Sequence, residues 1–174
     1  MKICIIGFSG SGKSTLAKRL AKFYNIAHLH LDSVHFLPNW IERNDDDMEK
    51  IVNDFMKENN SWIIDGNYRR IAKERFNNAD IIIFLAYNRF TCLNGVIKRY
   101  KKYKNSTRED MASGCNEKLD KEFLSWVLYR GRTKERYNIY KSLVDKAKEG
   151  YVFKNRKQLF KYLNKIGMED LKWN

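Results

Sequence analysis

Glycines, a lysine and hydroxyl side chains stand at fixed spacing near the start of the 174-residue chain. Residues 7–14 read Gly-Phe-Ser-Gly-Ser-Gly-Lys-Ser and satisfy the pattern G-x-x-x-x-G-K-[ST] at every fixed position. In such a loop, glycines let successive backbone N–H groups converge on phosphate oxygens, the lysine adds a positive charge, and the serine hydroxyl can bind Mg²⁺. The residues expected to surround the phosphates are Gly7, Ser9, Gly10, Ser11, Gly12, Lys13, Ser14 and Thr15.

The surroundings of this loop favour a phosphate site over a chance glycine-rich turn. Residues 2–6 form a short apolar run typical of a buried strand, and apolar residues recur at helical spacing from Leu16 to Tyr24. A helix that begins near Lys13 directs the positive end of its dipole toward a bound anion. The segment therefore predicts a site for a nucleoside triphosphate with Mg²⁺.

Two aspartates follow apolar runs that are predicted to be strands. Residues 27–31 lead to Asp32, and residues 62–64 lead to Asp65 and Gly66. Ligands bind beyond the carboxyl ends of parallel strands, so both carboxylates should lie on the side of the phosphate loop. One of them can hold Mg²⁺ through water, and the other can bind or deprotonate an acceptor. The alternative is that either aspartate only caps the following turn.

His28, His30 and Asp32 alternate along one predicted strand and therefore share a face, with His35 close behind. Two histidines and a carboxylate can bind a transition metal. The stronger interpretation is that His28 and His30 lie deeper in the sheet as hydrogen-bonded core residues, because an imidazole more often needs only a second hydrogen-bond partner.

Basic residues gather in two tracts, at 98–108 and 154–165, and three further arginines follow the first tract at 130, 132 and 136. Most of the lysines are expected to lie on solvated helix faces. Arginine grips phosphate oxygens through two parallel hydrogen bonds, so the arginines are the better candidates for catalysis. Their concentration suggests a lid that closes on the transferring phosphoryl group and excludes water. The candidates are Arg99, Arg108, Arg130, Arg132 and Arg136.

Short apolar runs alternate with amphipathic stretches along the whole chain. This alternation predicts the α/β class, with a parallel sheet covered by helices on both faces. We expect one domain, residues 1–174, with a lid-like insertion at about 99–136. A helix capped by Asn88 should turn Phe90 inward, and another should begin at Asn116. Further expected strands are 81–85 and 151–153, and further helices are 44–58, about 70–76, 134–147 and a final one around 159–166.

The composition excludes several classes of protein. No apolar stretch approaches the roughly 18 residues of a membrane span, and no signal peptide is evident, so a cytoplasmic protein without membrane attachment is expected. The three cysteines are widely separated, which disfavours a disulfide framework. The formal net charge of +13 predicts attraction to polyanions but does not choose between nucleic acid and nucleotide phosphates.

With these residues in hand, the chain resembles the adenylate-kinase-like P-loop kinases through residues 63–69, Ile-Ile-Asp-Gly-Asn-Tyr-Arg. Over nearly its whole length it is similar to the DNA topology modulation proteins of the FlaR type. The matching segments are His-Leu-Asp at 30–32, Trp-Ile-Ile-Asp-Gly-Asn-Tyr at 62–68, Thr-Arg-Glu-Asp-Met-Ala-Ser-Gly-Cys at 107–115, and then Glu117, Leu119-Asp120, Glu122-Phe123 and Trp126-Val127.

This resemblance implies a three-layer P-loop NTPase fold whose five-stranded parallel sheet has the order 2-3-1-4-5, with a small helical lid. It also implies that Asp65 helps to hold the water around magnesium, that Arg69 touches the acceptor, and that the loop at Asn155 cradles adenine. The Asp-Gly turn lacks the Phe-Pro-Arg that follows it in true adenylate kinases, and the stretch between Asp32 and Trp62 is short for a nucleoside-monophosphate-binding domain. A nucleotide, a nucleoside and a small hydroxylated metabolite all stay open as acceptors.

The residues and the resemblance together predict an ATP-dependent phosphotransferase that uses Mg²⁺. Lys13, Asp32 and the lid arginines are expected to be catalytic, and Ser14 and Asp65 to hold the metal. Asp32, Asp65, Gly66 and Arg69 are expected to meet the acceptor. The alternative is a nucleotide-dependent nucleic-acid-binding regulator, which the charge of +13 motivates. It is less favoured because the chain has no helix-turn-helix, zinc-finger or RNA-binding signature.

Overall fold

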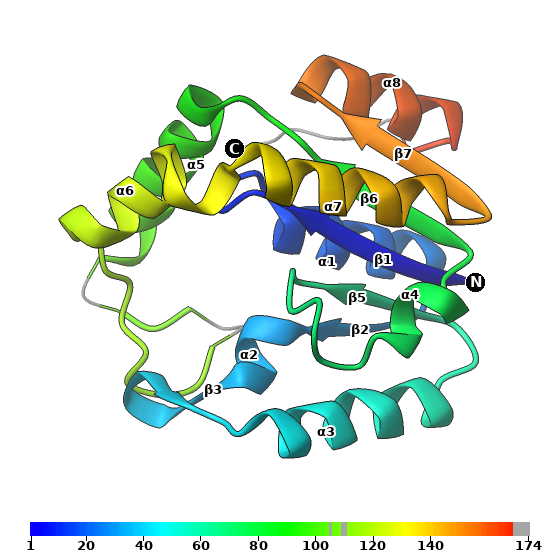
Figure 1. Ribbon diagram of the computed structural model, residues 1–174, viewed down its shortest axis with the longest axis horizontal. Helices are drawn as coiled ribbons and strands as arrows, with labels where there is room; N and C mark the ends of the chain where they lie inside the picture. Colours follow the sequence, from blue (N-terminus) through cyan, green and yellow to red (C-terminus); the bar gives the residue numbers. More distant parts are fainter. Residues whose placement is uncertain (105, 109–110, 169–174) are drawn as a thin grey trace.

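A central sheet of five parallel strands, with helices on both of its faces, makes a three-layer α/β/α architecture (Figure 1). The computed structural model describes residues 1–104, 106–108 and 111–168. The sheet has the spatial order β2-β5-β1-β6-β7. The strands are β1 (Lys2–Gly7), β2 (Ala27–His30), β5 (Trp62–Asp65), β6 (Ile81–Leu85) and β7 (Glu149–Phe153).

Counted along the chain, these five strands lie in the order 2-3-1-4-5, as expected. The labels run higher because two short strands, β3 (Phe36–Leu37) and β4 (Ile41–Glu42), pair antiparallel in a separate hairpin. Helix α7 crosses the front of the sheet in Figure 1 and α1 lies behind it. The helices are α1 (Lys13–Tyr24), α2 (Leu31–His35), α3 (Asp45–Glu58), α4 (Glu74–Asn78), α5 (Arg89–Tyr103), α6 (Lys121–Leu128), α7 (Lys134–Asp145) and α8 (Arg156–Lys165), with 3-10 turns η1 (Pro38–Trp40) and η2 (Arg130–Arg132).

The middle of the sheet forms the core. Every residue of β5 and β6, and all of β1 except Lys2, is buried. Helices cover both faces of these strands, so they consist of continuous apolar runs rather than of alternating apolar and polar residues. The carboxyl ends of the strands face left in Figure 1, toward α2, α5 and α6.

Local capping explains where several helices begin. The side chains of Asn44 and Asn88 accept hydrogen bonds from the backbone N–H groups of Asp47 and Thr91, which confirms the predicted starts of α3 and α5. The prediction at Asn116 is wrong, because α6 is capped by Asp120 instead. Asn116 pairs with Thr107 across the loop, so it is held in an extended segment.

Three other predictions need correction. Asp32 does not end a strand: β2 stops at His30, and Asp32 lies in the first turn of α2. The short helix expected at about 70–76 is α4, which begins only at Glu74, after Ala72 with a positive φ of 45°. Phe90 does not face inward but is 72% exposed, because it lies in the first turn of α5, beyond the edge of the core.

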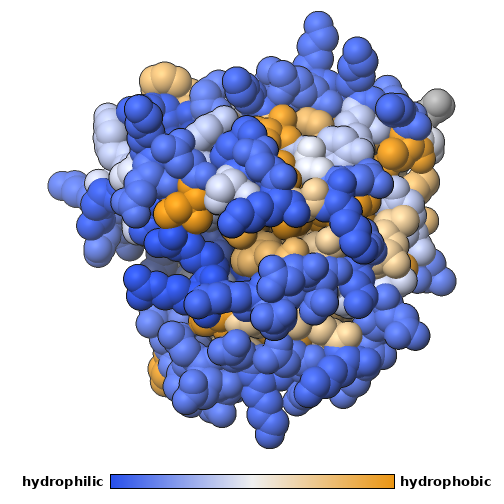
Figure 2. Space-filling model, turned by 45° about the vertical axis from the view of Figure 1, so that its right-hand side comes forward, coloured by the Kyte–Doolittle hydropathy of each residue, from blue (hydrophilic) through white to orange (hydrophobic). Residues whose placement is uncertain are grey.

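Hydrophilic side chains cover most of the face shown in Figure 2, and hydrophobic ones are exposed there only in small separate groups. Within the described ranges, none of the helices combines the length and the apolar character that crossing a membrane requires.

A close contact between backbones fixes the phosphate loop, residues 8–12, against α5. A β-carbon at Gly95 would lie 2.2 Å from the carbonyl oxygen of Gly10. A β-carbon at Gly10 would in turn lie 2.2 Å from the carbonyl oxygen of Cys92. Glycine is therefore needed at both positions for helix and loop to pack this closely.

We expect Gly95→Ala to lower the free energy of unfolding by about 1–3 kcal/mol, because the new methyl group collides with backbone. ATP affinity should fall as well, since the loop must move. Thermal unfolding and ATP titration measure the two effects. The matched control is Asn94→Ala, on the exposed side of α5, which gains similar helix propensity without a collision. Equal stability of the two variants would contradict the close-packing argument.

Candidate active site

The phosphate loop joins β1 to α1 and has the backbone form that its glycines permit. Gly10 and Gly12 have positive φ angles of 79° and 90°. The Ser11 N–H donates to the Phe8 carbonyl at 3.1 Å, which closes the loop. The Lys13 ammonium donates to the same carbonyl at 3.4 Å, so its side chain folds back over the loop. The loop and Lys13 thus form one cationic concavity at the start of α1.

Burial lowers the pKa of Lys13, and the carboxylates of Asp32 and Asp65 oppose that shift. These two acids therefore support the charged form of the lysine, which is the form that attracts phosphate.

Asn67 holds the end of β1 in a way that the sequence did not reveal. Its side-chain amide donates to the Gly7 carbonyl at 2.9 Å and accepts from the Gly7 N–H at 3.1 Å. Both backbone groups of the first loop glycine are thereby satisfied by one side chain from the segment after β5. The only sequence signal was that Asn67 directly follows the Asp65-Gly66 turn.

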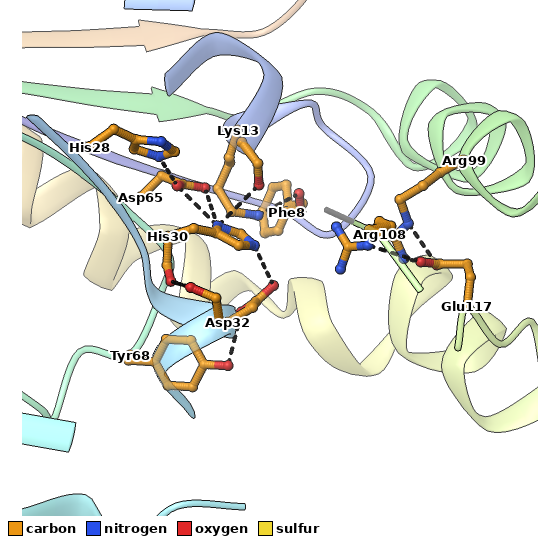
Figure 3. A network of polar contacts seen from close by, with 12 residues as sticks. Phe8, Lys13, His28, His30, Asp32, Asp65, Tyr68, Arg99, Arg108 and Glu117 are labelled. Atoms are coloured by element: carbon orange, nitrogen blue, oxygen red, sulfur yellow. Dashed lines mark hydrogen bonds and ion pairs between the residues drawn. The ribbon is translucent and has the colours of Figure 1, made fainter. Parts of the chain in front are cut away.

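A buried hydrogen-bond network joins two strands behind the phosphate loop (Figure 3). Asp65 at the end of β5 is fully buried, and its carboxylate contacts His28 Nε2 at 2.8 Å and His30 Nδ1 at 3.0 Å. His30 Nδ1 also lies 3.3 Å from the Ser14 hydroxyl. The interpretation of His28 and His30 as hydrogen-bonded core residues is confirmed.

The network sets the charge of Asp65. Burial acts to raise the pKa of Asp65, but hydrogen bonds from His28 and His30 outweigh it and hold that pKa well below its usual range. The carboxylate therefore stays ionised inside the protein at neutral pH. Because both of its oxygens are engaged, Asp65 reaches the phosphate loop through His30.

Asp32 occupies a different environment. Its side chain is 41% exposed, lies 3.6 Å from His30 Nε2, and accepts a hydrogen bond of 2.9 Å from the Tyr68 hydroxyl. Burial and the nearby Asp32 carboxylate raise the pKa of Tyr68, so its hydroxyl remains a proton donor. Asp32 is thus an oriented carboxylate with open access to solvent, which suits an acceptor-binding group.

A cavity of about 820 Å³ lies in front of the phosphate loop. The sequence-predicted residues that line it are Ser9, Gly10, Gly12, Lys13, Ser14, Thr15, Asp32, Arg99 and Arg108. Gly7, Ser11, Asp65, Gly66, Arg69 and Asn155 are not among the lining residues. Asn155 caps α8 by accepting from the Gln158 N–H, and its neighbour Arg156 lines the cavity.

Two of the five candidate arginines meet at one buried acid. Arg99 Nη2 lies 2.6 Å and Arg108 Nε 3.2 Å from the carboxylate of Glu117, whose side chain is 4% exposed. Figure 3 shows this group on the opposite side of the phosphate loop from the histidine–aspartate network. Glu117 was not identified as a site residue from the sequence, although it occurs in the matching lid segment.

The other three candidate arginines lie outside the cavity lining. Arg132 stacks on the Phe8 ring at 4.2 Å from its centroid, Arg136 lies 4.7 Å from the Trp126 ring centroid, and Arg130 pairs with Glu122 at 3.5 Å. Arg132 therefore packs against Phe8, the first residue of the phosphate loop. A catalytic role for these three stays a prediction. Glu109 and Asp110 of the matching lid segment lie outside the described residues.

The oxygen donors at the cavity suit Mg²⁺ better than a transition metal. Ser14 and Asp32 both line it, and hydroxyl and carboxylate oxygens are the ligands of a hard cation that keeps several of its waters. Within the described part of the chain, no group of three or more histidine, cysteine, aspartate or glutamate side chains could hold a metal ion.

The comparisons with known proteins agree with this fold. A family model described as "ATPase family associated with various cellular activities (AAA)" matches residues 3–85, a little under half of the chain. Shikimate kinase from Acinetobacter baumannii in complex with shikimate aligns with a TM-score of 0.57 at 17% identity, over 98% of this chain and 95% of that one. No curated protein sequence matches the chain.

Two further solved structures align over most of their length. Deoxyadenosine kinase from M. mycoides, with dCMP and dCDP bound as products, has a TM-score of 0.54 at 18% identity, over 96% of this chain and 99% of that one. Shikimate kinase from Bacteroides thetaiotaomicron has a TM-score of 0.56 at 16% identity, over 95% and 96%. The protein thus has the fold of the P-loop NTPases, with kinases among its structural neighbours. The likeness to the FlaR-type group stays a prediction.

The depressed pKa of Asp65 predicts how stability depends on pH. A carboxylate with a lowered folded pKa contributes stability that is fully present above its ordinary pKa of about 4 and is lost as pH falls through the folded value. We expect Asp65→Asn to lower the free energy of unfolding by about 3 kcal/mol at pH 7, and this deficit to shrink on acidification from pH 5 toward pH 2.

Denaturant unfolding at several pH values measures this difference. The control is Asp54→Asn, which should change little, because this half-exposed side chain pairs with the exposed Lys57 at the surface. A deficit for Asp65→Asn that stays constant across the acid range would contradict the assigned ionisation.

The burial of Glu117 predicts a second stability effect. Glu117→Ala leaves Arg99 and Arg108 without their shared counter-ion, and we expect it to cost about 3 kcal/mol in unfolding free energy. Glu122→Ala removes an acid that is 82% exposed and should cost less than about 1 kcal/mol. Thermal unfolding compares the two variants, and similar losses in both would show that the Glu117 pairs are not effectively buried.

Proposed function

We propose that the protein is an ATP-dependent phosphotransferase that moves the γ-phosphoryl group of Mg-ATP to a small acceptor. One observation carries the proposal. Lys13 and Ser14 of the phosphate loop line the same cavity as the Asp32 carboxylate. Two arginines, Arg99 and Arg108, line it as well. This arrangement brings phosphate binding, a base and charge-stabilising cations within reach of one transferring group.

The triphosphate would bind at the phosphate loop. The backbone N–H groups at the amino end of α1, from Lys13 onward, would face its oxygens, and the Lys13 ammonium would contact the β- and γ-phosphates. Arg99 and Arg108 stabilise the charge that spreads over the γ-phosphoryl oxygens during transfer. The Ser14 hydroxyl would hold Mg²⁺, with Asp65 acting on that hydroxyl through His30, which leaves Asp32 to the acceptor. When bound, the ion neutralises charge that develops on the phosphates.

Asp32 is the group that would activate the acceptor. The acceptor hydroxyl oxygen forms its bond to the γ-phosphorus as the bond from that phosphorus to the β,γ-bridging oxygen breaks. The hydroxyl proton passes to Asp32, and ADP leaves with the bridging oxygen. The hydrogen bond from Tyr68 fixes Oδ1 of Asp32, and Oδ2, which lies 3.6 Å from His30 Nε2, is the oxygen that would face the acceptor.

Residues 99–136 would act as the lid of this site. The segment contains Arg99, Arg108 and Glu117, which line the cavity, and its Ser113 carbonyl accepts a hydrogen bond from Asn39 of the β3–β4 hairpin. A lid of this kind keeps water from the phosphoryl group, so that transfer to the acceptor outcompetes hydrolysis.

We expect Lys13→Ala to lower acceptor-stimulated ADP release by at least about 100-fold, because the charge on the transferring phosphates is lost. The assay is ADP release from Mg-ATP over a panel of nucleoside monophosphates, nucleosides and hydroxylated metabolites. Lys22→Ala, an exposed lysine on the same helix, is the matched control. Full turnover in a folded Lys13→Ala variant, with folding checked by circular dichroism, would overturn the proposal.

Nucleic-acid binding is the second candidate, and a group of exposed aromatics favours it. Phe90 and Tyr129 are 72% and 61% exposed, and Arg89 lies 5.2 Å from the Tyr129 ring centroid. Exposed rings beside arginines suit stacking with unpaired bases. Titration of single-stranded DNA at several salt concentrations tests this candidate. Steep salt dependence that is lost in Phe90→Ala would support it, and no binding at low salt would end it.

A further inference from the structure

The hairpin formed by residues 36–42 places two aromatic side chains at the cavity that contains Asp32. Phe36 and Trp40 both line it, and their ring centroids lie 5.0 Å apart in an edge-to-face arrangement. Met111 and Phe123 of the lid segment line the same cavity. A flat ring that enters the cavity beside Phe36 and Trp40 would meet aromatic surface.

The backbone that presents Trp40 is strained. Asn39 and Trp40 have φ angles of +61° and +64°. Asparagine tolerates the left-handed region, but a bulky residue such as tryptophan rarely adopts it. Conformations of this kind persist only where the surroundings enforce them, and they concentrate at ligand-binding sites.

Residues 113–115 of the lid segment supply that enforcement. The Asn39 N–H donates to the Ser113 carbonyl at 3.1 Å, and the Trp40 N–H donates to Cys115 Sγ at 3.4 Å. The Cys115 thiol donates in turn to the Leu37 carbonyl at 3.4 Å. The two strained residues are therefore each held by one hydrogen bond from the lid segment.

Gly114 makes this contact possible. It has a φ of +75°, and a β-carbon there would lie 2.2 Å from Asn39 Oδ1. A larger residue there would collide with the Asn39 side chain and would be strained at this φ, so it would disturb the contact that holds Trp40.

The Trp40 indole N–H is buried and has no hydrogen-bond partner among the described residues. Leaving a buried donor unpaired is costly, and tryptophan normally finds a partner for this group. The unpaired donor is a second sign, beside the backbone strain, that the surroundings enforce the position of Trp40. A ligand ring could stack on the part of the indole that lines the cavity.

We propose that Trp40 selects an acceptor that carries a flat heteroaromatic ring, a nucleoside moiety, by stacking on it while the acceptor hydroxyl meets Asp32. The inference rests on the proposed phosphotransfer, of which it specifies the acceptor. Residues 113–115 hold Trp40 in its stacking position, so recognition of the ring depends on lid contact. Non-aromatic hydroxylated metabolites have no flat ring that could stack on the indole. Free nucleosides and nucleoside monophosphates share the ring, and the experiment separates them.

The test measures ADP release from Mg-ATP with nucleosides, nucleoside monophosphates, shikimate and gluconate as acceptors. We expect a nucleoside or its monophosphate to stimulate turnover. Trp40→Leu should raise the KM for that acceptor about 10-fold or more and leave the KM for ATP unchanged, because stacking on an aromatic side chain is lost. Trp40→Phe should restore much of the affinity, and equilibrium binding of the same acceptor in the presence of ADP should follow the same order.

Two glycine variants test the dependence on the lid segment. Gly114→Ala should raise the acceptor KM as Trp40→Leu does, although it adds only a methyl group and residue 40 is still tryptophan. Gly167→Ala is the matched control, since Gly167 has a similar φ of +82° but, among the described residues beyond its two chain neighbours, no atom within 4 Å of its β-carbon position. It carries comparable backbone strain away from the site and should leave the acceptor KM unchanged.

The outcomes separate this inference from the proposed function. Turnover with shikimate or gluconate but with no nucleoside or monophosphate would overturn the inference and support phosphotransfer. An unchanged acceptor KM in Trp40→Leu, or a raised KM for ATP instead, would also overturn it. If no acceptor stimulates ADP release above the level of Lys13→Ala, the proposed function fails and the inference fails with it.

Discussion

A carboxylate that water does not reach connects the parts of this site. Asp65 lies at the carboxyl end of β5, between the strand that leads into the phosphate loop and the strand that leads to Asp32. An ionised group in such a place must be paired and hydrogen-bonded. The two histidines of β2 meet that requirement, and His30 then extends the network to Ser14 and toward Asp32. The need to pair one buried charge thus fixes where the Ser14 hydroxyl and the Asp32 carboxylate lie relative to each other.

The sequence alone predicted those features that depend on residues close together in the chain. The phosphate loop follows from its own glycines, and the caps at Asn44 and Asn88 act over three residues. Asn116 looked equally suitable as a cap, but its pairing with Thr107 depends on how the loop closes. Likewise, Glu117 meets Arg99 across 18 positions, and Trp40 meets Cys115 across 75. Such contacts depend on tertiary packing, which no local pattern encodes.

Part of the chain's excess of basic residues lies at the cavity. Lysines and arginines dominate the charged residues of its lining, with Asp32, Glu117 and Asp120 as the acids. Glu117 holds two of these arginines near each other in a fixed geometry, because its buried carboxylate offsets their mutual repulsion. A polyphosphate that enters the cavity can then draw on cations that are already positioned, which lowers the cost of ordering them at the moment of transfer.

The two sides of the cavity come from distant parts of the chain, and this matters for a reaction that must exclude water. The hairpin 36–42 follows directly from α2, which contains Asp32, whereas residues 113–115 follow the segment that contains Arg99 and Arg108. The hydrogen bonds of Asn39 and Trp40 are where these two sides meet. Because residues 113–115 hold Trp40 in its strained conformation, the position of its side chain depends on whether those residues are in contact with the hairpin. In the proposed reaction, recognition of the acceptor and closure over the phosphates would therefore be joined in one small contact.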